Sequence, residues 1–198
     1  MLYKKLTVDA APYMASLHYI AFKNFFLTTL GKPFLSAFYK SVLLNANSVG
    51  IGGYDDDLKL ICFAVGTKNN SGFYKSVILN SWLVLGIAAL PALIKNPVKI
   101  KRLLTSLTSA PNNNHGPAPA LLSICIAPTS MAKGFGSTLL FEFENELLKF
   151  GLNEVVLTTD YSDNEHVNSF YLKNNYILID SFYQGKRKMN FYHKILKK

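Results

Sequence analysis

After residue 120 the chain alternates between short apolar runs and amphipathic segments. Leu121–Ile126 is an unbroken apolar run, as in a strand that is covered on both faces. Ser137–Phe150 has apolar residues at helical spacing, and Gly151 follows it as a helix-terminating glycine. The same reasoning predicts a strand, a helix and a closing pair of strands at Glu154–Thr159, Asn164–Asn174, Tyr176–Phe182 and Met189–Leu196.

Before residue 68 the pattern predicts two helices and a hairpin. Asp9 is a plausible N-cap for the first helix, and proline in the first turn favours the start of the second. The turn Asp55–Asp57 separates two strand patterns. The expected elements are a strand at Leu2–Val8, helices at Ala10–Phe25 and Pro33–Leu44, and strands at Ser48–Tyr54 and Lys59–Val65.

The middle of the chain contains alternating apolar and basic stretches. Ser71–Leu107 is predicted to be helical and to be divided by Pro91 and Pro97, and Ser109–Pro119 has the composition of a loop. No internal repeat and no linker splits the chain. Residues 1–198 therefore predict one α/β domain.

Composition narrows the class of protein. Hydrophobic residues make up 49% and charged residues 17% of the chain, as in globular proteins. Cys62 and Cys125 lie far apart in apolar runs, which favours buried, reduced thiols in a cytoplasmic protein with no metal site. The net charge of +9 suits an anionic ligand or an anionic membrane surface. Nucleic acid is not expected as a partner, because no nucleic-acid-binding motif accompanies the charge.

One segment is apolar enough to be considered as a membrane span. Val77–Ile94 reaches the lower limit for a bilayer span, but it contains Asn80, Ser81 and Pro91 and is interpreted as a buried or amphipathic helix. Basic residues follow at Lys95–Arg102. Peripheral contact of residues 77–102 with the inner face of the membrane is one hypothesis, and a homodimer surface is another.

The candidate chemistry begins where the strand at Leu121–Ile126 ends. Pro128 cannot extend a ladder, and Gly134 and Gly136 stand just before a helix. Glycines there let a ligand approach the backbone, and the first amides of the helix have no internal partner. Free amides at the positive end of a helix bind phosphate, and Lys133 adds a cation. The loop is neither a Walker A loop nor a dinucleotide-binding GxGxxG loop.

Two runs in this order resemble motifs of the GNAT superfamily of N-acetyltransferases. The run IAPTSMAKGFG at residues 126–136 is similar to that superfamily's acyl-CoA loop, V-x-P-x-x-Q/R-G-x-G-x-G/A. The run NEHVNSFYLKNNY at residues 164–176 is similar to its N-x-x-A-x-x-F/L-Y-x-K-x-G-F helix. Met131, Ala132 and Asn175 depart from the pattern, and asparagine tolerates the left-handed turn at the glycine position.

The resemblance implies a fold and a cofactor site. The fold is a single α/β domain (α+β by some schemes) with a mixed sheet of about seven strands flanked by helices. Residues 71–119 are then a helical insertion before the central strand that binds the acyl-CoA. Acetyl-CoA is the implied co-substrate. The residues that the resemblance assigns to it are Ile124, Ile126, Met131, Ala132, Lys133, Gly134, Phe135, Gly136, Ser137, Asn164 and Tyr171.

The resemblance further implies N-acyl transfer. The Tyr171 hydroxyl is placed near the thioester sulfur, where a phenol can protonate the departing thiolate. An aromatic core residue is the competing interpretation of Tyr171. The central strand has no carboxylate, so Asp160 and Asp163 are the nearest candidates for a general base, with water as the alternative.

The acceptor is expected to be the primary amine of a small molecule. The ending QGKRKMNFY and the helical insertion resemble members that act in surface-polysaccharide biosynthesis, which favours an amino sugar. Phe26 and Thr28 are the candidates to line its pocket. A peptide or protein N-acetyltransferase and a non-catalytic acyl-CoA sensor are the alternatives.

Overall fold

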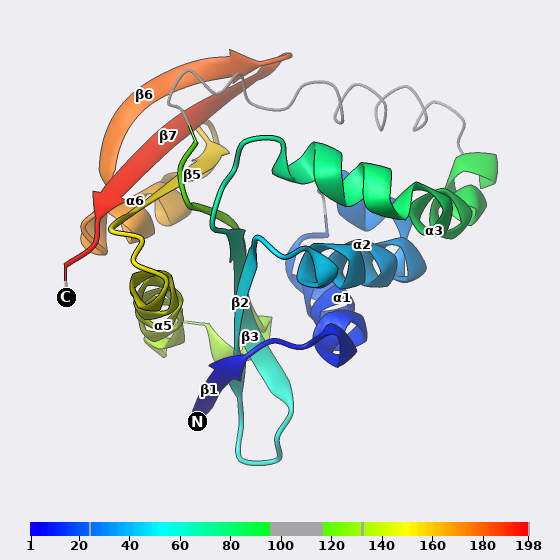
Figure 1. The fold of residues 1–198 in the computed structure, drawn as a ribbon, viewed down its shortest axis with the longest axis horizontal. Coiled ribbons are helices and arrows are strands. Elements are labelled where there is room, and N and C mark those ends of the chain that lie inside the picture. The colour runs from blue at the N-terminus through cyan, green and yellow to red at the C-terminus, as the bar shows by residue number, and fades with distance from the viewer. Residues whose placement is uncertain (24, 96–116, 132, 198) are drawn as a thin grey trace.

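The computed structural model describes residues 1–23, 25–95, 117–131 and 133–197, and in these residues one mixed sheet of seven strands forms the centre of the fold (Figure 1). The strand order is β1-β2-β3-β4-β5-β7-β6. All neighbours are antiparallel except β4 and β5, which are parallel. The bounds are β1 Leu2–Lys5, β2 Ser48–Tyr54, β3 Leu60–Thr67, β4 Ala120–Ile126, β5 Glu154–Asp160, β6 Ile177–Gln184 and β7 Arg187–Ile195. The predicted α/β architecture is confirmed.

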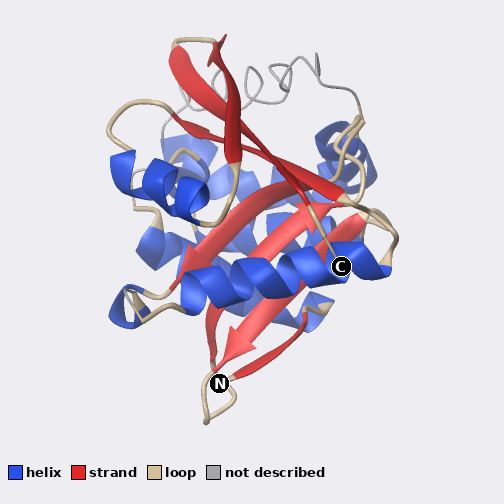
Figure 2. Cartoon of the chain, turned by 90° about the vertical axis from the view of Figure 1, so that its left-hand side faces the viewer, coloured by secondary structure: helices blue, strands red, loops and turns tan. Residues whose placement is uncertain are grey.

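Helices cover the two faces of the sheet, as Figures 1 and 2 show. On one face α1, α2 and α3 pack around a cluster that includes Met14, Tyr39 and Phe63. On the other face α5 and α6 pack around Phe143, Leu157 and neighbouring side chains. The helices are α1 Ala11–Ala21, α2 Lys32–Leu44, α3 Phe73–Lys95, α5 Phe135–Lys149 and α6 Glu165–Lys173.

The N-terminal elements are shorter than the apolar pattern predicts. The first strand ends at Lys5, and α1 ends at Ala21, four residues before the expected Phe25. Asp9 is not an N-cap: it lies inside a 3-10 turn, Val8–Ala10, and Ala10 precedes α1 without a side-chain cap. The apolar residues after Ala21 suggested a longer helix. They are apolar because the segment contains a second 3-10 turn, Leu27–Leu30, that packs on α2 and α3.

The long helix α3 also departs from expectation. Pro91 lies inside it and does not end it, whereas the backbone leaves helical geometry at Ser81 (φ −131°, ψ 16°). Among the described residues, Phe73–Ile94 is the segment long and apolar enough to cross a membrane, and only 17% of its apolar window is buried. The predicted continuation of the helix over 96–107 and most of the predicted loop, 109–116, lie outside the described residues.

Two left-handed turns and a buried ion pair fix the C-terminal half. Gly151 (φ 74°) lies just beyond α5 and Asn175 (φ 65°) just beyond α6, and each helix ends one residue before its predicted end. Glu144 of α5 is buried, accepts a hydrogen bond from the Tyr176 hydroxyl at 2.9 Å and pairs with Lys194 at 2.6 Å. These contacts hold α5 against β7 and the end of α6.

Both predicted cysteine environments are confirmed. Cys62 on β3 and Cys125 on β4 are free and buried. Burial raises the pKa of the Cys62 thiol to about 12, so this thiol stays protonated and unreactive at neutral pH.

Candidate active site

The parallel strands β4 and β5 meet at one end and separate toward the other. In the described residues their register joins only Ala120 and Val156, with the Val156 amide donating to the Pro119 carbonyl at 2.9 Å. In contrast, β3 accompanies β4 over its length, and β7 accompanies β5 over all seven of its residues. The sheet therefore opens between the carboxyl ends of β4 and β5, where α/β proteins place their ligands.

A bulge in β4 lies close to the residue at which the pairing with β5 ends. Val65 pairs with Ser123 and Gly66 pairs with Leu121, so Leu122 is the extra residue of β4. Bulges increase local twist and re-aim side chains. Gly66 makes the bulge possible, because a Cβ at this position would overlap the Ala120 carbonyl oxygen and the Phe143 ring.

The pairing of β4 with β3 decides which backbone groups face the opening. The Ala127 amide donates to the Ile61 carbonyl on β3 at 2.8 Å. Because backbone groups alternate along a strand, the amides of Ile124 and Ile126 point away from β3, toward the opening. These two residues are the ones that the sequence assigned to a cofactor.

The loop after β4 delivers the amino end of α5 to the same opening. Gly134 has φ +77°, a left-handed conformation that favours glycine, and it precedes the first helical residue, Phe135. The amides of Phe135, Gly136 and Ser137 belong to the first turn, where a helix offers unpaired donors. Met131, Lys133 and Ser137 are exposed beside them. Ala132 lies outside the described residues.

Gly136 brings three of the predicted segments together. A Cβ at this glycine would lie 3.0 Å from Ile126 Cδ1 and 3.2 Å from Phe170 Cε2. The end of β4, the start of α5 and the helix α6 are therefore in direct contact. The structure thus unites the two sequence motifs in one place.

Tyr171 on α6 lies buried in the same region. Its ring packs on Phe170, Tyr176 and Tyr192, with ring centroids 5.3 to 5.8 Å apart. Burial, and then the nearby Tyr192, raise the pKa of its phenol, which keeps the hydroxyl protonated at neutral pH. The residue has the protonation state of a proton donor, and it is also part of the core.

Asp160 ends β5 and is held by Arg187. The guanidinium contacts both carboxylate oxygens at 2.7 Å. A carboxylate in such a bidentate pair is not free to accept a substrate proton unless Arg187 moves. Its role as a base stays a prediction, and the visible role is to join β5 to β7. Asp163, the second candidate, has φ 54° in the following turn.

Two asparagines of α6 and its N-cap form hydrogen bonds with the end of β5, beside the opening. Asn164 donates to the Thr159 hydroxyl at 2.6 Å and to the Asp160 carbonyl at 3.1 Å. Asn168 donates to the same carbonyl and accepts from Tyr192 and Asn190. The side-chain nitrogen of Asn164 is thus occupied by the protein, and its contact with a cofactor remains a prediction.

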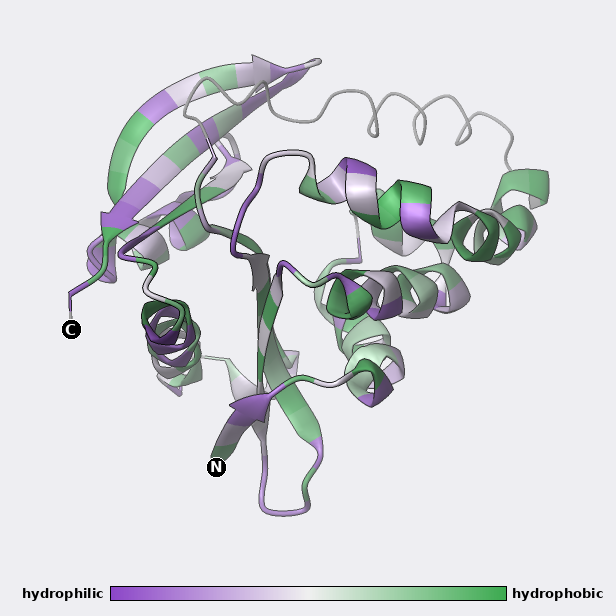
Figure 3. Cartoon of the chain, in the orientation of Figure 1, coloured by the Kyte–Doolittle hydropathy of each residue, from purple (hydrophilic) through white to green (hydrophobic). Residues whose placement is uncertain are grey.

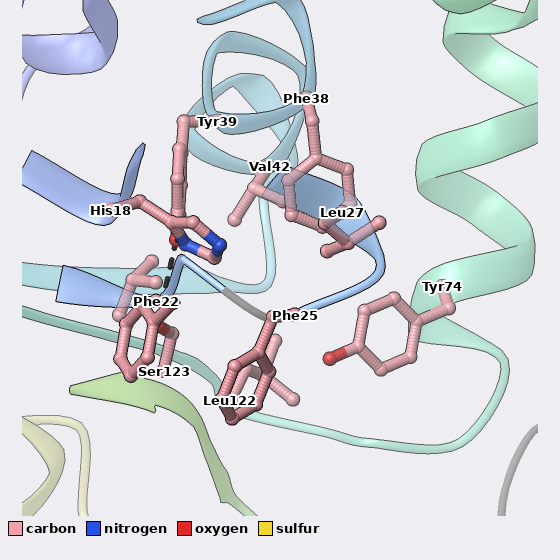
Figure 4. A pocket seen from close by; sticks show the side chains of 11 residues that line it. His18, Phe22, Phe25, Leu27, Phe38, Tyr39, Val42, Tyr74, Leu122 and Ser123 are labelled. Carbon is pink, nitrogen blue, oxygen red and sulfur yellow. Dashed lines mark hydrogen bonds between the residues drawn. The ribbon is translucent and has the colours of Figure 1, made fainter. Parts of the chain in front are cut away.

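A cavity of about 150 Å³ lies on the other face of β4, between α1, α2 and α3 (Figure 4). Leu122 and Ser123 at the bulge form one wall. His18 Nδ1 and the Tyr39 hydroxyl are 2.6 Å apart, and the Tyr39 and Ser123 oxygens are 3.5 Å apart. Burial lowers the pKa of His18 to about 4, so its imidazole is neutral at neutral pH.

Sequence reasoning placed one wall of the acceptor site around Phe25–Phe34, and it missed His18, Tyr39 and Ser123. Phe26 and Thr28, the predicted lining, do not line the cavity; Phe25 and Leu27 do. The reason is the 3-10 turn at Leu27–Leu30, in which Thr28 donates to the Phe22 carbonyl and Phe26 packs toward α3. The signal for His18 was a single histidine inside an apolar helix. No cluster of His, Cys, Asp or Glu in the described ranges is suited to a metal ion.

Solved structures with this arrangement identify the fold. A GNAT-family protein from Desulfovibrio desulfuricans is 12% identical, with 98% of each chain covered and a TM-score of 0.63. An aminoglycoside 6'-N-acetyltransferase complexed with coenzyme A is 11% identical, with 100% of this chain and 98% of that chain covered and a TM-score of 0.62. The ribosomal-protein-S18-alanine N-acetyltransferase of Escherichia coli is 13% identical, covering 100% and 94%, with a TM-score of 0.60.

The chain therefore has the GNAT fold over its full length. No protein-family model and no curated protein matches its sequence. The fold that the two motifs predicted is confirmed by the structure and by these neighbours.

Proposed function

We propose that the protein is an acyl-CoA-dependent N-acyltransferase that transfers an acetyl group from acetyl-CoA to a primary amine. The observation that carries the proposal is the opening between β4 and β5 beside the glycine-held amino end of α5. A pantetheine arm fits such an opening, because the Ile124 and Ile126 amides point into it, and a pyrophosphate fits the first amides of α5. The neighbour complexed with coenzyme A supports this assignment.

The residues at the opening suit acyl transfer. A bound thioester would supply the activated acyl carbonyl. The amides of Ile124 and Ile126 are placed to stabilise negative charge on an oxygen at the strand edge. Tyr171 holds a proton for the thiolate. Because Arg187 occupies Asp160, we propose that the amine binds neutral or loses its proton to water.

For the acceptor we propose a small-molecule amine, and an amino sugar is the candidate that the sequence favours. The neighbours named above act on acceptors as different as an aminoglycoside and a ribosomal protein. The acceptor is therefore chosen by the side chains of the cavity and not by the fold.

Acetyl-CoA is expected to raise the melting temperature. At a hundred times its dissociation constant, a ligand adds about 2.7 kcal/mol, or roughly 5–10 °C for a chain of this size. Ser137→Asp would place a carboxylate at the first turn of α5 and should weaken acetyl-CoA binding about tenfold or more. Differential scanning fluorimetry at increasing acetyl-CoA concentration measures both effects.

Ser137→Asn is the matched control, because it has the size of the aspartate without its charge. It should bind acetyl-CoA nearly as tightly as the wild type. Ser137 is exposed, so neither variant should lower the stability of the free protein. No temperature shift with any CoA thioester would refute the proposal.

We further propose that the enzyme is cytoplasmic and that it rests on an anionic membrane through α3. Large apolar side chains stand exposed on this helix, including Trp82 (62% exposed) and Ile87 (66%), and Figure 3 shows its C-terminal half almost entirely apolar. Helices of this composition are normally buried in protein or in lipid. The net charge of +9 favours anionic lipid as the occupant. The basic residues 96–102 lie outside the described ranges.

Sedimentation with vesicles tests this contact. The protein should sediment with phosphatidylglycerol vesicles and much less with phosphatidylcholine vesicles. Ile87→Glu should reduce sedimentation several-fold, because it places a charge in the apolar surface. Asn80→Gln, at an exposed polar position of the same helix, adds no charge; it is the control and should bind as the wild type does. A dimer in solution that Ile87→Glu converts to monomer, without vesicle binding, would replace lipid by a second copy.

A further inference from the structure

The cavity between α1, α2 and β4 is mostly apolar and carries no charge. Phe22, Phe25 and Phe38 form much of its wall, and the side chains that line it in the described part of the chain include no carboxylate, lysine or arginine. A site for a polyamine or an aminoglycoside needs anionic groups to balance several ammonium charges. This cavity therefore suits an acceptor whose bound part is uncharged.

The volume of the cavity, about 150 Å³, is enough for a single ring. Apolar cavities of about 150 Å³ in proteins hold one benzene molecule. Aromatic walls favour a ring with an apolar face, because such a face packs on them without leaving hydroxyl groups unpaired. A fully hydroxylated hexose would bury several hydroxyls here against few partners.

His18 is the unused hydrogen-bonding group of this cavity. The side chain is only 6% exposed, and Nε2 is buried without a partner in the described structure, while Nδ1 is engaged by Tyr39. Figure 4 shows the imidazole facing the space that Phe25, Leu27 and Phe38 enclose. A buried polar atom without a partner costs free energy, which a ligand group at Nε2 would recover.

The cavity and the opening in the sheet are lined by neighbouring residues of β4. Ser123 contributes to the cavity wall, and Ile124, the next residue, turns its amide into the gap between β4 and β5. The bulge at Leu122 is what places Leu122 and Ser123 together at the cavity. An acceptor seated here approaches β4 from the face opposite α5.

We infer that this cavity binds one uncharged six-membered ring of the acceptor, which carries the primary amine on the ring or on a short arm and offers a hydrogen-bonding group to His18 Nε2. The inference rests on the proposed N-acyltransferase activity and names its substrate class. Two sources share this chemistry: an alicyclic or aromatic amine, and a deoxy amino sugar with few hydroxyls. His18 then positions the acceptor and takes no part in bond making.

An acceptor series tests the inference with the full-length protein and acetyl-CoA. Transfer is measured as the release of CoA in the presence of 4-hydroxybenzylamine, 4-(aminomethyl)cyclohexanol, a 4-amino-4,6-dideoxyhexose, glucosamine or spermidine. The ring amines or the dideoxy sugar should show kcat/KM at least tenfold above glucosamine and spermidine. If the two ring amines have the higher kcat/KM, the acceptor is an alicyclic or aromatic amine. If the dideoxyhexose has the higher kcat/KM, the acceptor is a deoxy amino sugar. Preference for spermidine or glucosamine overturns the inference.

Two variants locate the binding. Leu27→Trp fills the cavity, and His18→Asn keeps a polar atom near Tyr39 but removes the group at Nε2. Each variant should raise the KM for the preferred ring acceptor tenfold or more and leave the KM for acetyl-CoA unchanged. His18→Gln restores a polar atom near the position of Nε2. It should therefore have a lower acceptor KM than His18→Asn. A retained acetyl-CoA temperature shift shows that each variant is folded.

The failures are distinguishable. If acetyl-CoA gives no temperature shift, the proposed function is wrong. If acetyl-CoA binds but Leu27→Trp leaves the KM for every acceptor unchanged, the cavity is not the acceptor site and this inference is wrong.

Discussion

Tyr171→Phe is expected to lower kcat for acetyl transfer by about a hundredfold or more, because proton donation by a positioned side chain contributes roughly 10²–10⁴ to a rate. The variant removes only the hydroxyl, and the ring can keep its contacts with Phe170, Tyr176 and Tyr192. Affinity for acetyl-CoA should change little. Steady-state kinetics and the acetyl-CoA temperature shift measure the two quantities separately.

Tyr192→Phe is the matched control. It removes a hydroxyl from the adjacent ring, one that donates to Asn168 at 2.9 Å. It should cost stability, about 1 kcal/mol for a hydrogen bond, and leave kcat within a few-fold of the wild type. Equal loss of kcat in both variants would mean that the Tyr171 hydroxyl acts only through packing.

Gly66→Ala is expected to destabilise the fold by about 2–3 kcal/mol or more, as overpacking of a tight site does. The added methyl group meets the Ala120 carbonyl oxygen, which is backbone, and the buried Phe143 ring, so neither neighbour moves easily. The melting temperature should fall by roughly 5–10 °C. Thermal or urea denaturation monitored by circular dichroism measures the change.

Gly86→Ala on α3 controls for the loss of a glycine. A Cβ at Gly86 meets open space, so this variant should be neutral or stabilised by up to about 1 kcal/mol. Gly66→Ala should also weaken acetyl-CoA binding, because the bulge it disturbs aims β4 at the opening. Wild-type stability and wild-type acetyl-CoA affinity in Gly66→Ala would show that the bulge does not set the geometry of β4.

The strand β4 links the two proposed binding regions. Its pairing with β3 turns the backbone amides of Ile124 and Ile126 toward the opening beside α5, and its bulge places the side chains of Leu122 and Ser123 at the cavity beside α1. A change in register of one residue would exchange these roles. The tight contact at Gly66 holds the register in place.

The sequence by itself determined the order of most elements, and it predicted the phosphate site at the amino end of α5. Apolar periodicity and turn residues are local signals, so the strand at Leu121–Ile126 and the helix ends at Gly151 and Asn175 followed from them. The runs at residues 126–136 and 164–176 were sufficient to predict the fold. In the folded chain these two runs are in contact at Gly136 and Phe170.

Only the tertiary structure decided the parts that depend on contacts between distant segments. Three features depend on residues that are more than 20 positions apart in the sequence. They are the short pairing of β4 with β5, the ion pair of Arg187 with Asp160, and the contact of His18 with Tyr39 in the cavity. Periodicity carries no information on such pairs. The sequence therefore named Asp160 as a base and Phe26 and Thr28 as pocket residues, whereas packing paired the first with Arg187 and turned the others away from the cavity.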